Sequence, residues 1–151
     1  MLRGLIKILL GNLHKYDATN SSTQKFDFAK LTFVDKIMAC KLLKFVVQAT
    51  EAYDKFELKK VHDLTVKFLA HDFSEYYLPI SRERLMMREG SPEHISSQMI
   101  YSKVLLVMLQ ALAPILPLTT QEAYGNIKAT NSAIVSEDFL PSYCQEEAKL
   151  P

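Results

Sequence analysis

The sequence predicts an all-α protein, an antiparallel bundle of four to five helices. Apolar residues recur at spacings of three and four along most of the chain, as one face of a helix requires. Only four of the 151 residues are glycine, and no stretch alternates apolar and polar residues over the length of a strand. Because 48% of the residues are apolar, the chain is expected to bury one sizeable core.

The first helix is expected in the N-terminal stretch MLRGLIKILLGNL. Its apolar face is formed by Leu2, Leu5, Ile6, Leu9 and Leu13. Arg3 and Lys7 fall on another face, and no acidic residue precedes Asp17. This pattern fits either a docked amphipathic helix or a mitochondrial presequence, whereas Lys7 interrupts any core of a secretory signal peptide. Residues 17–30 indicate a polar connection.

The second helix is predicted from about Thr32 to Glu57, with Thr32 and Asp35 as its N-terminal capping signal. A seam that faces the bundle steps by four and three along Met38, Leu42, Phe45, Ala49, Ala52 and Phe56. The charged stretch DKFELKK then predicts a turn between antiparallel helices.

The third helix is predicted from about Leu58 to Ile80, and its continuation to Met87 stays open. Its buried side is expected to comprise Val61, Leu64, Phe68, Phe73, Tyr76, Tyr77 and Ile80. Pro79 removes one amide donor and is expected to kink the helix.

The stretch REGSPEH is the sharpest break in the chain. Gly90 suits a helix C-terminus, Ser91 an N-cap and Pro92 the first helical position. The fourth helix is therefore predicted from Pro92 to about Leu112, and its nearly continuous apolar second half indicates a central place in the bundle.

Pro114 is expected to end the fourth helix. Thr119 and Glu122 form a capping box for a short fifth helix over about Thr120 to Ile127. The bundle is thus expected to occupy residues 1–127, followed by an irregular C-terminal extension over residues 128–151.

Several function classes lack their sequence signals. No P-loop, glycine-rich dinucleotide motif or metalloprotease motif is present. Cys40 and Cys144 are far apart, which speaks against a zinc site and favours a reducing compartment. His71 and Glu75 lie one helical turn apart, but no second such pair supports a metal bundle. The longest apolar run is interrupted and shorter than the ~20 residues of a membrane span.

Three segments, in order, resemble the anticodon-binding helical domain of class I aminoacyl-tRNA synthetases, and most of all the isoleucyl enzyme of bacterial and organellar type. LRGLIKILLGNL resembles that family's I-R-N-T-F-R-F-L-L-G-N-L, and LAPILPLTTQEAY resembles L-A-P-I-L-P-F-T-A-E-E-I-W. The segment from Thr50 to Leu85 resembles A-Y-E-x-Y-E-F-H-x-V followed by Y-L-D-I-S-K-D-R-L-Y. Gly4, Pro79 and Tyr124 depart from the residues usual in the family.

This resemblance implies a module that grips the anticodon side of a tRNA during ATP-dependent aminoacylation in translation. The HIGH-type and KMSKS-type motifs of the catalytic domain are absent. The chain alone is therefore predicted to be inactive, with no catalytic residue and no metal, since ATP and Mg²⁺ belong to the full-length enzyme. The implied partners are tRNA and, if the chain is a piece of the enzyme, its catalytic domain. The expected compartment is cytoplasmic or mitochondrial, with mitochondrial favoured in a eukaryote.

A net charge of +1 gives no overall attraction to nucleic acid, so any RNA contact needs a local basic patch. The candidate tRNA contacts on the first helix and the turn after it are Arg3, Lys7, Asn12, His14, Lys15 and Tyr16. A second candidate group follows Pro79 and contains Arg82, Arg84 and Arg88. A plain solvated face is the alternative for both groups. A helical interaction or adaptor protein that has lost RNA binding is the alternative function.

Overall fold

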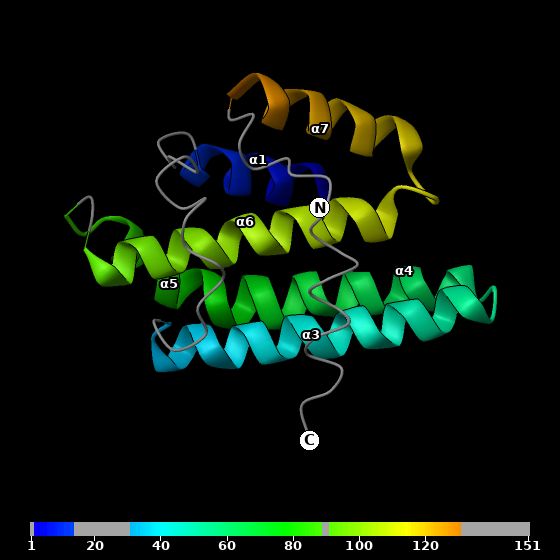
Figure 1. Ribbon diagram of the computed structural model, residues 1–151, viewed down its shortest axis with the longest axis horizontal. Helices are drawn as coiled ribbons and strands as arrows, with labels where there is room; N and C mark the ends of the chain where they lie inside the picture. The colour runs from blue at the N-terminus through cyan, green and yellow to red at the C-terminus, as the bar shows by residue number, and fades with distance from the viewer. Residues whose placement is uncertain (1, 14–30, 89–90, 131–151) are drawn as a thin grey trace.

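The computed structural model describes residues 2–13, 31–88 and 91–130, and every regular element within these ranges is a helix (Figure 1). The elements are α1 (Leu2–Leu13), α3 (Phe33–Asp54), α4 (Leu58–Lys67), the π-helix η2 (Phe68–Tyr77), α5 (Leu78–Leu85), α6 (Pro92–Leu112) and α7 (Pro117–Thr130). The predicted all-α bundle is confirmed. Because α4, η2 and α5 follow one another without a break, they form a single rod.

The helix α6 lies at the centre of the bundle. Figure 1 shows α3 and the α4–α5 rod side by side on one side of α6, with α1 and α7 on the other. Contacts join α6 to α1, α3, α4, α5 and α7. Its bounds, Pro92 to Leu112, are those predicted, and the Ser91 hydroxyl caps it by accepting from the His94 amide at 3.2 Å.

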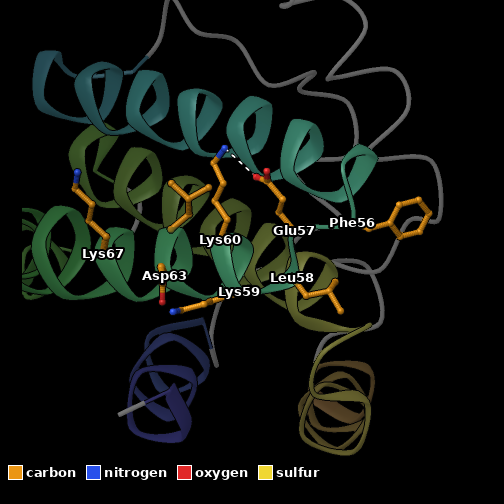
Figure 2. Close-up of a pocket in the computed structure, with 8 residues that line it drawn as sticks. Phe56, Glu57, Leu58, Lys59, Lys60, Asp63 and Lys67 are labelled. Carbon is orange, nitrogen blue, oxygen red and sulfur yellow. Dashed lines mark ion pairs between the residues drawn. The ribbon is translucent and has the colours of Figure 1, made fainter.

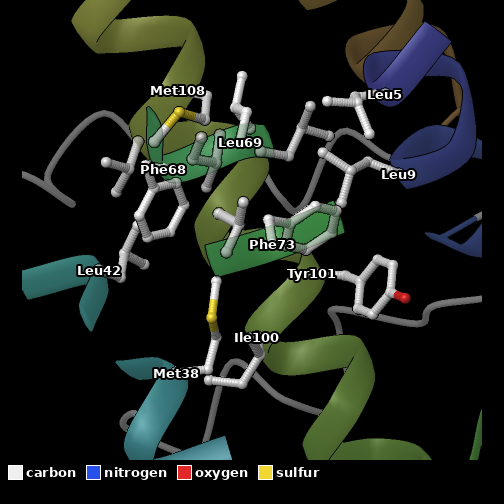
Figure 3. Close-up of a cluster of buried hydrophobic side chains, with 14 of the residues drawn as sticks. Leu5, Leu9, Met38, Leu42, Phe68, Leu69, Phe73, Ile100, Tyr101 and Met108 are labelled. Atoms are coloured by element: carbon white, nitrogen blue, oxygen red, sulfur yellow. The ribbon is translucent and has the colours of Figure 1, made fainter. Parts of the chain in front are cut away.

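The length and apolar composition of α6 would also allow it to cross a membrane, but 78% of that apolar stretch is buried inside the bundle. A helix that is apolar nearly all round and buried in this way is expected at the centre of a helical core. The side chains around it, drawn in Figure 3, come from α1, α3, η2 and α6. Phe73 and Tyr101 meet edge to face there, with ring centroids 5.5 Å apart.

The helix α1 docks against α6 through the leucines that the sequence placed on one face. Leu5, Leu9 and Leu13 are all buried. The packing of these leucines accounts for the amphipathic pattern of the N-terminal segment. The predicted polar connection over residues 17–30 lies outside the described residues.

The seam predicted for the second helix is confirmed from Met38 to Ala52, and it is wrong at Phe56, which is exposed. The helix α3 ends at Asp54 because the chain turns there. The Glu57 amide donates to the Ala52 carbonyl oxygen at 2.8 Å, and the Phe56 amide donates to Tyr53 at 2.9 Å. These two bonds form a Schellman motif, which ends a helix and reverses the chain.

The rod after this turn extends to Leu85 and includes an unpredicted π-helix. Phe68, Phe73 and Tyr77 are buried as predicted, whereas Tyr76 and Ile80 are exposed. In a π-helix the hydrogen bonds run from residue i to residue i+5. The wider turn keeps Phe73 and Tyr77 in the core and rotates Tyr76 outward, so the spacing rule for an α-helix gave the wrong face.

The helix α7 begins at Pro117, before the predicted start at Thr120. Pro117 suits a first helical turn because that turn has no partner for its amide groups. Thr119 therefore lies inside the helix, and the predicted capping box is wrong. Glu122 instead forms an ion pair with Arg3 of α1 at 2.8 Å. The predicted extension lies outside the described residues from position 131 onward, and α7 itself runs to Thr130.

Candidate nucleic-acid interface

A buried carboxylate joins three helices at one end of the bundle. Asp35 of α3 is fully buried and accepts hydrogen bonds from three hydroxyl groups. The Tyr77 hydroxyl donates at 2.5 Å, the Ser96 hydroxyl at 2.5 Å and the Thr32 hydroxyl at 2.6 Å. A buried charge is tolerated when it has several donors of this kind. Asp35 thereby fixes η2 and α6 against the start of α3.

Arg84 of α5 reaches the same carboxylate. Its Nη1 atom donates to the Thr32 hydroxyl at 2.6 Å and lies 3.4 Å from Oδ2 of Asp35, and its side chain is only 19% exposed. Arg84 therefore holds the end of α5 against α3. Of the four arginines predicted to contact tRNA, Arg84 has the least exposed side chain, and its RNA contact stays a prediction.

A second layer of hydroxyl groups connects η2, α5 and α6. Ser81 donates to the Tyr77 carbonyl oxygen at 2.8 Å, and its hydroxyl lies 2.7 Å from the hydroxyl of Tyr101. Burial raises the pKa of Tyr77 above its usual range, and the nearby charge of Asp35 raises it further. Burial likewise raises the pKa of Tyr101. Both phenols therefore stay neutral and can donate hydrogen bonds at physiological pH.

This polar framework positions one wall of a groove between α1, α5 and α6. The groove has a volume of about 370 Å³, within the range of sites that bind small molecules. Its lining comprises Ile8, Asn12, Leu78, Arg82, Leu85, Met86 and Tyr101. The groove thus brings together two residues that the sequence analysis placed in separate groups, Asn12 of α1 and Arg82 of α5.

The polar side chains that line the groove are those of Asn12, Arg82 and Tyr101. The Asn12 side-chain nitrogen donates to the Ile8 carbonyl oxygen at 2.9 Å, so its amide oxygen is the part that can accept from a ligand. The Asn12 backbone carbonyl accepts from Gln98 of α6 at 3.4 Å, which ties the end of α1 to α6. Arg82 is exposed, in contrast to Arg84. The remaining lining is apolar apart from Tyr101.

The other predicted contacts lie elsewhere or outside the described residues. Arg3 pairs with Glu122 of α7, and Lys7 is exposed on α1. Arg88 is exposed near the end of the second described range. His14, Lys15 and Tyr16, which directly follow α1 in the sequence, lie outside the described residues.

The two residues considered as a metal site, His71 and Glu75, lie within hydrogen-bond distance of each other, and the neighbouring Asp72 forms an ion pair. His71 Nδ1 lies 2.9 Å from Glu75, and Asp72 accepts from Lys41 at 2.7 Å. Over the ranges that the structure describes, no three metal-ligating side chains gather in one place. The Lys41 ammonium also lies 4.7 Å from the centroid of the Tyr76 ring, so this surface is a network of charges on a helix face.

Sequence reasoning missed the most connected polar residue of the bundle. Asp35 was interpreted as a capping residue, yet the Thr32 hydroxyl donates to its side chain and makes no cap bond to a backbone amide. The only signal in the sequence was one acid in the first turn of a helix whose buried face is otherwise apolar. Ser96 and Tyr77 are distant in sequence, so nothing in the local pattern placed them around it.

Comparison with known proteins defines the class of this bundle. Residues 35–150 match the family model described as the anticodon-binding domain of tRNA ligase. The chain belongs to this family. No solved structure matched the chain.

Similar curated proteins include isoleucine–tRNA ligases of several bacteria. That of Kosmotoga olearia is 32% identical over 148 residues, which cover 96% of this chain. That of Fervidobacterium nodosum is 36% identical over 124 residues, or 82% of this chain, and that of Thermotoga maritima is 29% identical over 96% of it. The chain spans only 13 to 16% of the length of these relatives. The resemblance to the isoleucyl enzyme is therefore confirmed for this domain.

Proposed function

We propose that this chain binds the anticodon side of a tRNA and serves isoleucine–tRNA ligation in translation. The groove between α1, α5 and α6 is the proposed contact surface. The observation that carries this proposal is the meeting of Arg82 and Asn12 in one groove with an apolar wall. Single-stranded RNA is recognised by this combination of a cation, a few polar groups and apolar surface for unstacked bases.

Each lining group has a chemical role in the proposal. The Arg82 guanidinium binds a phosphate or the acceptor atoms of a base edge, because it presents several donors in one plane. The Asn12 amide oxygen accepts from a base amino group. Ile8 and Met86 cover one face of an unstacked base. Lys7, exposed on the same helix as Asn12, supplies charge to the neighbouring phosphates.

In this proposal the domain orients the tRNA, and the chemistry of aminoacylation takes place elsewhere. No ATP-binding motif is present in the sequence, and the family match covers the anticodon-binding domain. ATP, Mg²⁺ and the catalytic domain are therefore assigned to the part of the ligase that this chain does not match.

The proposal is tested by titrating the chain with a labelled anticodon stem-loop of isoleucine tRNA over a series of salt concentrations. Arg82→Glu is expected to weaken binding roughly tenfold or more and to reduce the salt slope by about one phosphate contact. The matched control is Lys44→Glu, which makes the same charge change on an exposed position of α3.

Equal losses in both variants would indicate a general charge effect and contradict the assignment to the groove. A wild-type chain that is folded but has no affinity for the stem-loop would favour the adaptor alternative. Circular dichroism of each variant establishes that the bundle is intact.

A further inference from the structure

The turn between α3 and α4 presents an aromatic ring to solvent on a strained backbone. Phe56 has a φ of 57°, and it is the only residue other than glycine with a positive φ in the part of the chain that the structure describes. Its side chain is 89% exposed. Figure 2 shows the ring projecting away from the bundle beyond the end of α3.

This position favours glycine. Phe56 is the residue that adopts the left-handed conformation in the Schellman motif, a place where a Cβ atom is unfavourable. The ring does not recover this cost by packing, because it is almost entirely exposed. Strained residues of this kind persist mostly where they serve binding. Because the left-handed conformation of Phe56 lowers the stability of the fold without a compensating contact inside it, we expect the phenyl ring to contact a binding partner.

Lysine side chains line a hollow beside Phe56. It has a volume of about 680 Å³ and lies along α4, from the turn before it to Lys67 at its end (Figure 2). Its charged lining consists of Lys59, Lys60, Lys67, Glu57 and Asp63. Glu57 and Lys60 neutralise each other, with the two charged atoms 3.1 Å apart, which leaves Lys59 and Lys67 against Asp63. Lys55, which directly precedes the ring, is also exposed, and Asp54 before it is the nearest acid in the sequence.

We propose that Phe56 is a stacking platform for an unpaired RNA base, and that Lys59 and Lys67 of this hollow bind the phosphates on either side of that base. Base stacking on an exposed aromatic ring combined with a cationic surface is the usual way of holding single strands without regard to sequence. The contact is separate from the groove of Arg82 and Asn12 and does not depend on it.

An RNA fits this surface better than a protein partner does. A stable protein interface needs an apolar core that excludes water over a large area. The hollow offers one aromatic ring, Leu58 and Leu64 among five charged side chains. One base between two phosphates matches that pattern of a single ring flanked by cations.

The test uses two substitutions that separate the ring from the fold. Phe56→Gly removes the ring and relieves the backbone strain, so a loss of binding cannot be attributed to unfolding. Phe56→Tyr keeps an aromatic ring at the same position. Binding of a short oligoadenylate carrying a fluorescent purine analogue is measured by titration, since stacking on the ring changes the emission of that analogue.

Phe56→Gly is expected to weaken oligoadenylate binding about five- to a hundredfold, whereas Phe56→Tyr is expected to stay within about twofold of the wild-type chain. Equal affinity and equal emission for Phe56→Gly and the wild-type chain would overturn the proposal. The Arg82→Glu variant is titrated with the same probe. The expected result is that Arg82→Glu binds oligoadenylate as tightly as the wild-type chain, whereas Phe56→Gly binds it more weakly. This result would support the Phe56 contact even if the stem-loop titration contradicted the groove.

Discussion

The carboxylate of Asp35 and the hydroxyl of Tyr77 lie 2.5 Å apart, and both side chains are completely buried. This contact joins the start of α3 to the end of the π-helix. With Ser96, Thr32 and Arg84 on its other oxygen, Asp35 has four polar side-chain partners. The end of the bundle that carries the Arg82 groove is therefore held by polar contacts as well as by apolar packing.

Replacing the buried acid should destabilise the whole fold. Asp35→Ala leaves the buried hydroxyl groups of Tyr77 and Ser96 without their acceptor. It also removes the ion-pair partner of Arg84 and one partner of the half-buried Thr32 hydroxyl. We expect a loss of about 3 kcal/mol or more in the free energy of unfolding. Urea unfolding followed by circular dichroism measures it. Asp54→Ala, at an exposed position of the same helix, should change stability by less than about 0.5 kcal/mol, and similar losses in both variants would contradict the role of Asp35.

A charge in the central helix should unfold the bundle. Leu106 of α6 is buried, so Leu106→Asp places a carboxylate in the apolar core without a partner. The control makes the same substitution at Leu118 of α7, which is 81% exposed. We expect loss of the cooperative thermal transition for Leu106→Asp only. A melting curve like that of the wild-type chain would show that α6 is not central.

Relief of strain at the α3–α4 turn should stabilise the chain. Phe56→Gly removes the Cβ atom from a left-handed backbone conformation and should raise the free energy of unfolding by about 1 kcal/mol. Phe56→Ala removes the ring but keeps the Cβ atom, so it should leave stability nearly unchanged. Urea midpoints distinguish the two variants. Equal gains in both would assign the effect to the exposed ring and not to the backbone.

Lys103 of α6 should make stability depend on pH in the alkaline range. Burial lowers its pKa to about 8 from a usual value of 10.5. Between these values the unfolded chain binds more protons at this residue than the folded chain does, so stability rises with pH. The rise begins near pH 8 and approaches about 1.4 kcal/mol per pH unit. It is best followed to pH 10, where the tyrosines of the unfolded chain begin to ionise.

The Lys103→Met variant lacks this group and should show a flatter profile over the same interval. Urea midpoints at a series of pH values for the two chains give the comparison. Parallel profiles would mean that Lys103 is solvated in the folded chain and titrates normally.

Periodicity and end signals predicted most of the architecture. Ser91 and Pro92 defined the start of α6, and its continuous apolar sequence predicted its central place. The leucines of α1 predicted its buried face. These features depend on neighbouring residues along the chain, which is why a single sequence contains them. The meeting of Arg82 and Asn12 in one groove cannot be predicted from neighbouring residues, because it results from the packing of α1 against α5 and α6.

The errors also have identifiable causes. Phe56 continued a regular seam, but the helix ended one turn earlier in a conformation that the spacing of apolar residues does not encode. Tyr76 was placed inside by α-helical spacing and was rotated outward by the π-helix. Thr119 and Glu122 fit the pattern of a capping box, but the helix α7 begins earlier, at Pro117, which is itself suited to the first turn of a helix.

The length of α3 separates the two proposed RNA contacts. Its first turn touches Arg84 near the groove, and Phe56 follows its last turn. Its 22 residues correspond to about 33 Å. An oligonucleotide shorter than this span occupies one end at a time, whereas a longer strand can bridge both and gain avidity from the high local concentration of its second half. The affinity of the bundle for single-stranded RNA would then increase once the strand is long enough to reach both contacts.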